Sequence, residues 1–363
     1  MSITFYTLDV GHGLCQVIRF GDRAILIDGG GRIGKRIGED FLKRYIRVVV
    51  AYVATHNDAD HVAAAPELLN NYPTASTLHS IWLLLDRPAA TSSQTDEMVI
   101  PLLGYSKRRQ EQGTIGSRHA LYVYDDLPNE ARLIHREDSE SAELQVIFPR
   151  ILDTSSAVIR GQPNAAATNQ VSAILRLVVD ASQHRASALI TGDANCQSFQ
   201  IAHQYGFKLD ARVLSIPHHG GEIPNPSGSA NWATVVDWIA PEIAVVSAGY
   251  GTVPPSTTTK RETFDAFRKS DIITCCTQIT KHCHPNYQSF HPSVVPPSRR
   301  PLPQMSGTID YPSAVACAGT ITIKVAPAGD VTLVRRHAHQ DAVDDKVLPK
   351  PGCPHCRAST QAN

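Results

Sequence analysis

Short apolar runs recur along the chain in two series, and they constrain the fold more than any other feature. The first series is Ile3–Asp9, Leu14–Phe20, Ala24–Asp28 and Val48–Ala54; the second is Leu144–Phe148, Val171–Val179, Ala186–Ile190, Val213–Ile216 and Ile243–Val246. Runs this short are typical of β-strands. Helices are expected at Lys35–Tyr45, Val62–Asn70, Cys196–Gln204, Trp232–Ile239 and Arg261–Lys269. Two β-rich halves that each end in helices bury their apolar faces most simply as two packed sheets covered by helices on both outer faces. The sequence therefore predicts an α/β fold, a four-layer αββα sandwich.

We expect one domain over residues 1–336, followed by a polar tail at 337–363. Residues 87–140 are polar and are expected to be an insertion, irregular apart from a helix around Asp96–Gln112. A proline-rich loop is expected at about 285–312, and Gly319–Ala326 with Val331–Arg336 is expected to form a closing hairpin.

Charge and composition limit the classes of function. Lysine plus arginine equal aspartate plus glutamate at 34 each, so no overall positive field indicates nucleic-acid binding. No apolar run approaches the roughly 20 residues that span a bilayer, and the first residues lack the pattern of a signal peptide. The eight cysteines do not form the dense framework of a small secreted domain. We therefore expect a cytoplasmic protein with no membrane partner.

The segment Thr55–His61 carries the densest chemical signal. His56, Asp58, Asp60 and His61 directly follow an apolar strand, and a loop at a strand end can turn all four side chains inward. Imidazole nitrogens and carboxylate oxygens are ligands for zinc and, where oxygen dominates, for manganese. The alternative is a solvated turn with helix-capping aspartates.

Two later segments repeat this layout of a strand followed by polar residues. Asp193 follows the strand Ala186–Ile190 after a glycine, and it suits a bridging ligand or, alternatively, the N-cap of the next helix. His218 and His219 follow the strand Val213–Ile216. Neighbouring histidines rarely bind one metal together, so we expect one of the pair to be a ligand and the other to face the substrate or support the ligands. The pattern does not decide between them, and we name His218 as the ligand and His219 as the catalytic group. A purely structural role for the pair is the alternative.

Cys353 and Cys356 in the tail have the spacing of half a zinc site, which His337 and His339 would complete. A tail with two free thiols is the competing interpretation, and redox chemistry is a third.

Taken in order, these segments resemble the metallo-β-lactamase superfamily, and within it the soluble catalytic domain of the DNA-uptake protein ComEC. The resemblance covers roughly residues 1–280 and rests on Leu8–Gly13, Leu26–Gly30, Thr55–His61, Leu189–Asp193, Pro217–Gly220 and Val245–Gly249.

The resemblance implies a role for each matching residue. His56 and Asp58 would hold a first metal, Asp60 and His61 a second, and Asp193 would bridge the two. His218 or His219 would complete the second site. Asp28 matches a buried aspartate that orients the metal loop through hydrogen bonds, and Asn169 stands where most members have a further histidine.

The same resemblance implies two divalent metal ions, zinc or manganese, that activate a hydroxide positioned by Asp60. The leading hypothesis is a phosphodiesterase or nuclease acting on a phosphodiester substrate, with nucleic acid among the candidates. A lactone, lactam or thioester hydrolase is the alternative, and a non-catalytic metal-bound interaction module is a third. The chain departs from ComEC-like sequences at His12 and Leu14, where glutamine and an acidic residue are usual.

Overall fold

The computed structural model describes residues 3–31, 35–71, 78–84, 102–123 except 103 and 114, 132–137, 141–153 except 152, 169–179, 186–249 except 224 and 226, 260–268, 272–278 and 320–334. The predicted proline-rich loop and the tail with Cys353 and Cys356 lie outside these residues. None of the described helices is long and apolar enough to cross a membrane.

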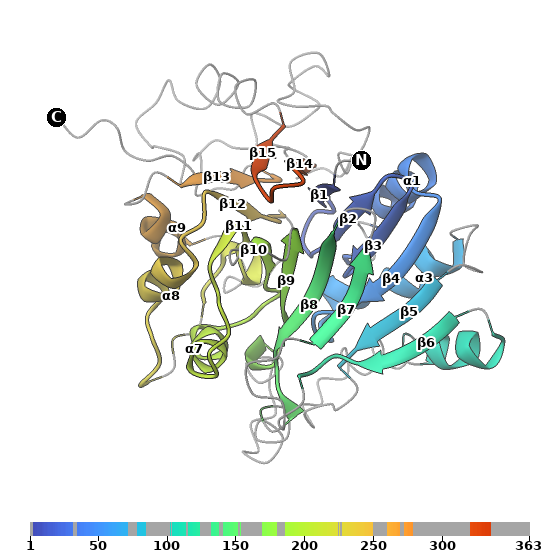
Figure 1. Cartoon of the computed structure of the whole chain (residues 1–363), viewed down its shortest axis with the longest axis horizontal. Coiled ribbons are helices and arrows are strands. Elements are labelled where there is room, and N and C mark those ends of the chain that lie inside the picture. Colours follow the sequence, from blue (N-terminus) through green and yellow to red (C-terminus); the bar gives the residue numbers. More distant parts are fainter. Residues whose placement is uncertain are drawn as a thin grey trace.

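Two sheets form the centre of the molecule (Figure 1). The first has the strand order β15 (Val331–Leu333), β14 (Ile321–Val325), β1 (Ile3–Thr7), β2 (Gln16–Phe20), β3 (Arg23–Ile27), β4 (Val48–Val53), β5 (Leu78–Leu83) and β6 (Ile115–Ala120). The second has the order β13 (Ile273–Cys276), β12 (Ile243–Val246), β11 (Ala211–Ser215), β10 (Ala186–Ile190), β9 (Ile174–Val179), β8 (Ala142–Phe148) and β7 (Arg132–Glu137).

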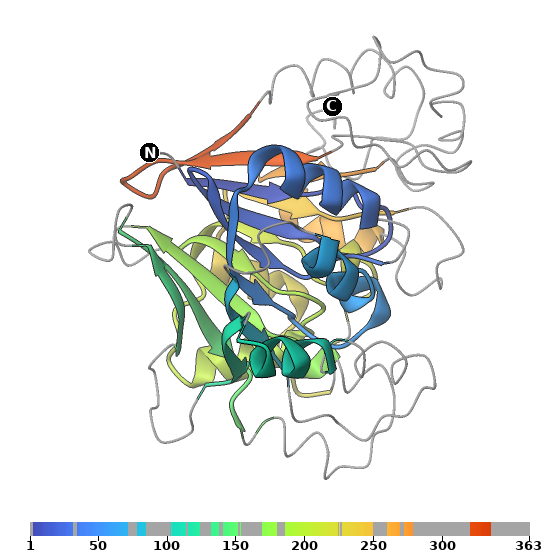
Figure 2. The ribbon, with the colours of Figure 1, turned by 90° about the vertical axis from the view of Figure 1, so that its right-hand side faces the viewer.

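Helices cover the outer faces of both sheets (Figure 2). The first sheet carries α1 (Lys35–Tyr45) and α3 (Ala65–Asn71), and the second carries α7 (Cys196–Gln204), α8 (Trp232–Ile239) and α9 (Arg261–Arg268). Side chains alternate along each strand. On β1, Phe5 belongs to the apolar core shared by both sheets, whereas Tyr6 packs with Phe41 of α1. This alternation buries both faces of the sheet and confirms the predicted αββα sandwich.

The structure contains strands that the sequence did not indicate. The helices α1, α7 and α8 have the predicted bounds, and residues 104–111 are helical as expected. The expectation that residues 87–140 are otherwise irregular is wrong for β6 and β7. Both are rich in polar residues and each is the last strand of its sheet among the described residues. An edge strand needs fewer apolar side chains than a central one. Apolar periodicity could not reveal them.

The topology brings the ends of several strands to one edge of the sandwich. Strands β3 to β6 run parallel in one sheet, and β10 to β13 run parallel in the other. The loops that follow parallel strands therefore emerge on the same side. A backbone hydrogen bond from Ala173 N to Thr55 O, 2.8 Å long, joins the two sheets at this edge.

Asp9, which follows β1, is fully buried. Its Oδ1 accepts a hydrogen bond of 2.8 Å from Gln278 Nε2, and its Oδ2 has no hydrogen-bond partner among the described residues. Burial raises the pKa of Asp9 to about 7, although the bonds from Gln278 and Gly11 partly oppose this. The folded protein therefore retains a proton on Asp9 at pH values where the unfolded chain has lost it.

This burial predicts a pH-dependent stability. Between pH 4 and 7 the native state binds the Asp9 proton more tightly than the unfolded state, so its free energy of unfolding falls as the pH rises. Asp9→Asn keeps the acceptor for Gln278 and removes the titration. We expect the variant to gain up to about 4 kcal/mol relative to wild type between pH 4 and pH 8, because each tenfold difference in proton affinity between the two states corresponds to about 1.36 kcal/mol. Urea denaturation over this pH range tests the effect, and a constant difference between the two proteins would refute it.

Candidate metal centre

The loop after β4 is fixed in place by the buried carboxylate of Asp28. Asp28 Oδ1 accepts from Thr55 N at 2.8 Å, and Oδ2 accepts from Thr55 Oγ1 and from His61 Nδ1, each at 2.7 Å. Asp28 itself has a left-handed backbone, with φ of 55°. The one-turn helix α2 (Ala59–Val62) then directs His61 into the protein. Asp28 thus connects the beginning and the end of the loop that the sequence singled out.

Asp193 reaches the same place from the second sheet. It follows β10 and a glycine, Gly192, whose φ of 49° suits a residue without a Cβ. A Cβ at Gly192 would collide with the side chains of Ser172 and Thr55. Ser172 Oγ accepts a hydrogen bond of 2.9 Å from Asp193 N. The loops of the two sheets are therefore packed directly against each other.

The two carboxylate oxygens of Asp193 face different histidines. Oδ1 lies 3.1 Å from His61 Nε2 and 3.8 Å from His219 Nε2, whereas Oδ2 lies 3.7 Å from His56 Nε2. Asp58 Oδ2 lies 3.6 Å from the same nitrogen of His56. Asp193 thus stands between two groups of potential ligands, as a bridging carboxylate would.

The three imidazoles share one arrangement: Nδ1 is hydrogen-bonded to the surrounding protein and Nε2 faces the carboxylates. His61 Nδ1 contacts Asp28 Oδ2. His219 Nδ1 lies 3.0 Å from the carbonyl oxygen of Ser247. His56 Nδ1 lies 3.1 Å from Thr55 Oγ1, which donates its own hydrogen to Asp28. In each case the partner accepts, so Nδ1 carries the hydrogen and Nε2 is left as a ligand atom.

His219, rather than His218, takes part in the cluster. His218 Nδ1 lies 2.6 Å from the carbonyl oxygen of Glu222, and His218 is absent from the groups of potential ligands among the described residues. Both residues have a left-handed backbone, with φ of 53° and 54°. Such a conformation is costly for a residue with a Cβ and is often found at functional sites. The adjacent pair therefore splits, with one imidazole facing the cluster and the other facing the backbone of its own loop.

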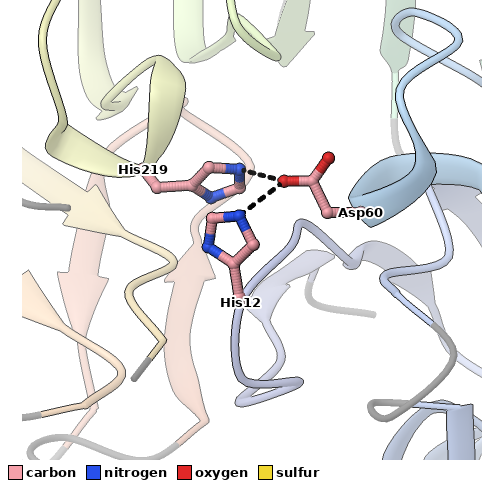
Figure 3. Close-up of side chains that lie close together, drawn as sticks. All are labelled: His12, Asp60 and His219. Atoms are coloured by element: carbon pink, nitrogen blue, oxygen red, sulfur yellow. Dashed lines mark hydrogen bonds and ion pairs between the residues drawn. The ribbon is translucent and has the colours of Figure 1, made fainter. Parts of the chain in front are cut away.

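His12 joins the cluster from the loop between β1 and β2 (Figure 3). Its Nε2 lies 3.0 Å from Asp60 Oδ2, and His219 Nε2 lies 3.1 Å from the same oxygen. The three ligand atoms lie within 4.8 Å of one another, as do those of His56, His61 and Asp193. In the sequence, His12 stood out only as a departure from related sequences and received no role. No spacing rule links residue 12 to residues 60 and 219.

The donor set fits divalent metal ions. Among the described residues, His56 Nε2 and Asn169 Oδ1 are buried and have no hydrogen-bond partner. Unpaired polar atoms are rare in protein interiors because each costs free energy. His61 Nε2 and His219 Nε2 also face each other at 3.3 Å. Two nitrogen lone pairs at this distance repel unless a metal ion lies beside them or one nitrogen carries a proton.

The electrostatics of the cluster point the same way. Burial alone would lower the pKa of His61, but the carboxylates of Asp193 and Asp28 outweigh it and raise that pKa well above its usual value. Burial alone would raise the pKa of Asp60, but hydrogen bonds with His12 and His219 hold it well below the usual range. The carboxylates therefore stay ionised and need positive charge nearby. Protons on the imidazoles can supply that charge, and metal ions can replace those protons.

The comparisons with known proteins agree with this architecture. A family model described as the metallo-beta-lactamase superfamily matches residues 8–135. No curated protein sequence matches the chain. Similar solved structures include unliganded yeast PDE1, with 8% identity, coverage of 76% of this chain and 98% of that chain, and a TM-score of 0.45. Igni18, a metallo hydrolase from the archaeon Ignicoccus hospitalis, has 13% identity, 76% and 94% coverage and a TM-score of 0.42.

Human tRNase Z, short form, has 14% identity, 69% and 93% coverage and a TM-score of 0.39. At such identities and scores these likenesses concern the fold alone. Over residues 8–135 the sequence is similar to the metallo-β-lactamase superfamily, and the described residues form the two-sheet αββα sandwich.

Proposed function

We propose that this chain is a metal-dependent hydrolase that holds two divalent ions, zinc or manganese, and cleaves a phosphodiester. The first site would consist of His56, Asp58 and Asp193, and the second of Asp60, His61, His219 and Asp193. The proposal is supported above all by Asp193, which directs one oxygen at His56 Nε2 and the other at His61 Nε2 and His219 Nε2. A carboxylate between two sets of ligand atoms is the arrangement that a two-metal centre requires.

The choice between His218 and His219 follows from their contacts. The sequence interpretation named His218 as the ligand and His219 as the catalytic group. We now propose His219 as the ligand, because its Nε2 lies within 3.8 Å of Asp60, His61 and Asp193. His218 would support the turn through its bond to Glu222 O.

The oxygen content of the first site favours a phosphodiester over a lactone, lactam or thioester. That site has one imidazole and two carboxylates, and such a set accepts a harder ion than an all-histidine site does. When bound, the two ions would lower the pKa of a water molecule and stabilise the charge on the attacking and leaving oxygens. These are the demands of phosphodiester hydrolysis. Cleavage of a lactone, lactam or thioester by the same residues is the alternative.

The residues of the chain have complementary tasks in this scheme. Asp28, Ser247 and Thr55 keep a hydrogen on Nδ1 of the three imidazoles, so each Nε2 is available as a ligand. Asp60, with 23% of its side chain exposed, lies at the outer side of the cluster, where it can orient an attacking water molecule or accept its proton. Asn169 is buried close in sequence to Ser172, which contacts His56 and Asp193, and it is a candidate supporting residue.

We expect the purified protein to hydrolyse bis(p-nitrophenyl) phosphate and single- or double-stranded DNA only when zinc or manganese is present. Asp193→Asn removes the charge but not the shape of the bridging carboxylate, and it should reduce the rate at least about 100-fold, more than loss of a supporting residue causes. Elemental analysis should show a matching loss of metal.

Asp237→Asn, on the exposed face of α8, is the matched control and should behave like wild type. Cleavage that persists after complete removal of metal would exclude the proposal. Two bound metal ions without cleavage of any phosphodiester would favour the lactone, lactam or thioester alternative.

Asp28→Asn tests how the ligands are positioned. Asparagine has nearly the same shape and tolerates the left-handed backbone. It has only one acceptor oxygen, however, whereas the bonds from Thr55 and His61 use both carboxylate oxygens of Asp28. We expect metal affinity to fall about 10- to 100-fold, the usual effect of losing such a partner. Competition with a chromophoric chelator measures this fall, and circular dichroism checks the fold. A folded variant with unchanged affinity would show that Asp28 does not position the ligands.

A further inference from the structure

His12 is the one member of the cluster that the two-metal scheme leaves without a role. Its Nε2 lies 3.0 Å from Asp60 Oδ2, and its ring lies 4.8 Å from the ring of His219, centroid to centroid. Figure 3 shows both imidazoles directed at the same carboxylate oxygen. A partly exposed imidazole can lie beside a cluster without binding anything. The contacts that hold His12 in place therefore bear on its role.

The loop that carries His12 is fixed by close backbone contacts. A Cβ at Gly249 would overlap the backbone of Gly11 and His12, and a Cβ at Gly13 would overlap the carbonyl oxygen of Asp60. Glycine at both positions therefore lets the β1–β2 loop lie directly against its neighbours. Leu14 N also donates to Asp60 O at 3.2 Å. The backbone around His12 is thus held against the backbone of Asp60, the residue whose carboxylate the His12 side chain contacts.

Ser247 connects this loop to the second histidine. Its hydroxyl donates to Gly13 O at 2.6 Å, and its carbonyl oxygen accepts from His219 Nδ1 at 3.0 Å. One residue at the end of β12 therefore sets the position of the His12 loop and the orientation of the His219 ring. A framework of this kind is expected where two side chains must meet at a fixed distance.

The distances match those between ligands of one ion. Nitrogen and oxygen ligands bind such ions at roughly 2.0–2.2 Å, which places neighbouring ligand atoms roughly 3–3.5 Å apart. The separations from Asp60 Oδ2 to His12 Nε2 and His219 Nε2 are 3.0 and 3.1 Å. His61 Nε2 lies 3.3 Å from His219 Nε2 and completes the set.

We propose that His12 is an additional ligand of the second metal, with Asp60, His61, His219 and the bridging Asp193; this inference rests on the proposed two-metal function. The second site then holds three imidazoles, whereas the first site holds one imidazole with Asp58 and Asp193. Nitrogen-rich sites favour zinc and other later transition metals, and oxygen-rich sites favour manganese. The two sites of this chain therefore differ in metal preference, and His12 creates much of the difference.

The test uses the full-length protein, stripped of metal and then titrated with Co²⁺ and with Zn²⁺. Visible absorption of Co²⁺ reports the ligands, and competition with a chromophoric chelator reports zinc affinity. Wild type is compared with His12→Ala and His12→Gln. His203→Ala is the matched control, because His203 is an exposed histidine of α7 that stacks on Trp238 away from the cluster.

We expect both His12 variants to lose at least about tenfold in affinity for one of two zinc equivalents, as loss of a direct ligand should cost no less than loss of a supporting partner. The Co²⁺ spectrum of that equivalent should change, and the other equivalent and His203→Ala should match wild type. If His12→Gln keeps the wild-type zinc affinity and Co²⁺ spectrum, His12 is not a ligand. If, in addition, His12→Ala loses affinity, His12 acts as a hydrogen-bond partner of Asp60, a role that glutamine can also fill. A wild-type chain that binds fewer than two ions would instead overturn the proposed function itself.

Discussion

The buried carboxylate of Asp28 is the interaction on which the rest of the site depends. It accepts three hydrogen bonds, two from Thr55 and one from His61, and it is fully buried. A buried charge is tolerable only when its bonds are satisfied. Asp28 accepts hydrogen bonds from His61 Nδ1 and from the Thr55 hydroxyl. The first bond leaves Nε2 of His61 free of hydrogen, and the second makes Thr55 an acceptor for His56 Nδ1, which leaves Nε2 of His56 free in the same way. Residues that surround the cluster therefore determine which nitrogen of each imidazole faces it.

The fold makes this possible by joining two sheets at one edge. Asp28 and the His56–His61 loop come from the first sheet, and Asp193 and His219 come from the second. Neither sheet alone holds all three imidazoles and the carboxylate that we propose as the bridge. The backbone bond between Ala173 and Thr55, together with the close approach of Gly192 to Thr55 and Ser172, fixes the spacing of the two sheets where the proposed ligands meet.

Local pattern predicted much of this arrangement, and its failures have physical causes. His56, Asp58, Asp60 and His61 could be singled out because they cluster directly after an apolar strand, and Asp193 because it follows another. The choice between His218 and His219 could not be made from sequence, because it depends on two left-handed residues that turn one ring inward and the other toward Glu222 O. The strands β6 and β7 were missed because these two edge strands lack the apolar pattern. His12 was left without a role because its meeting with Asp60 arises from tertiary packing of glycines, which no spacing encodes.

The left-handed backbone at His218 and His219 shows how strongly the cluster constrains its surroundings. Each of these conformations costs on the order of 1 kcal/mol or more for a residue with a Cβ. The turn gains compensation from backbone bonds, since His218 N donates to Gly192 O and Gly221 N donates to His218 O. The first of these bonds reaches the glycine that precedes Asp193. Strain in one loop is therefore offset by contact with the loop that carries Asp193, which couples the position of His219 to that of Asp193. A change that relaxed the turn would move both groups, and for this reason the two loops are best regarded as a single unit of the site.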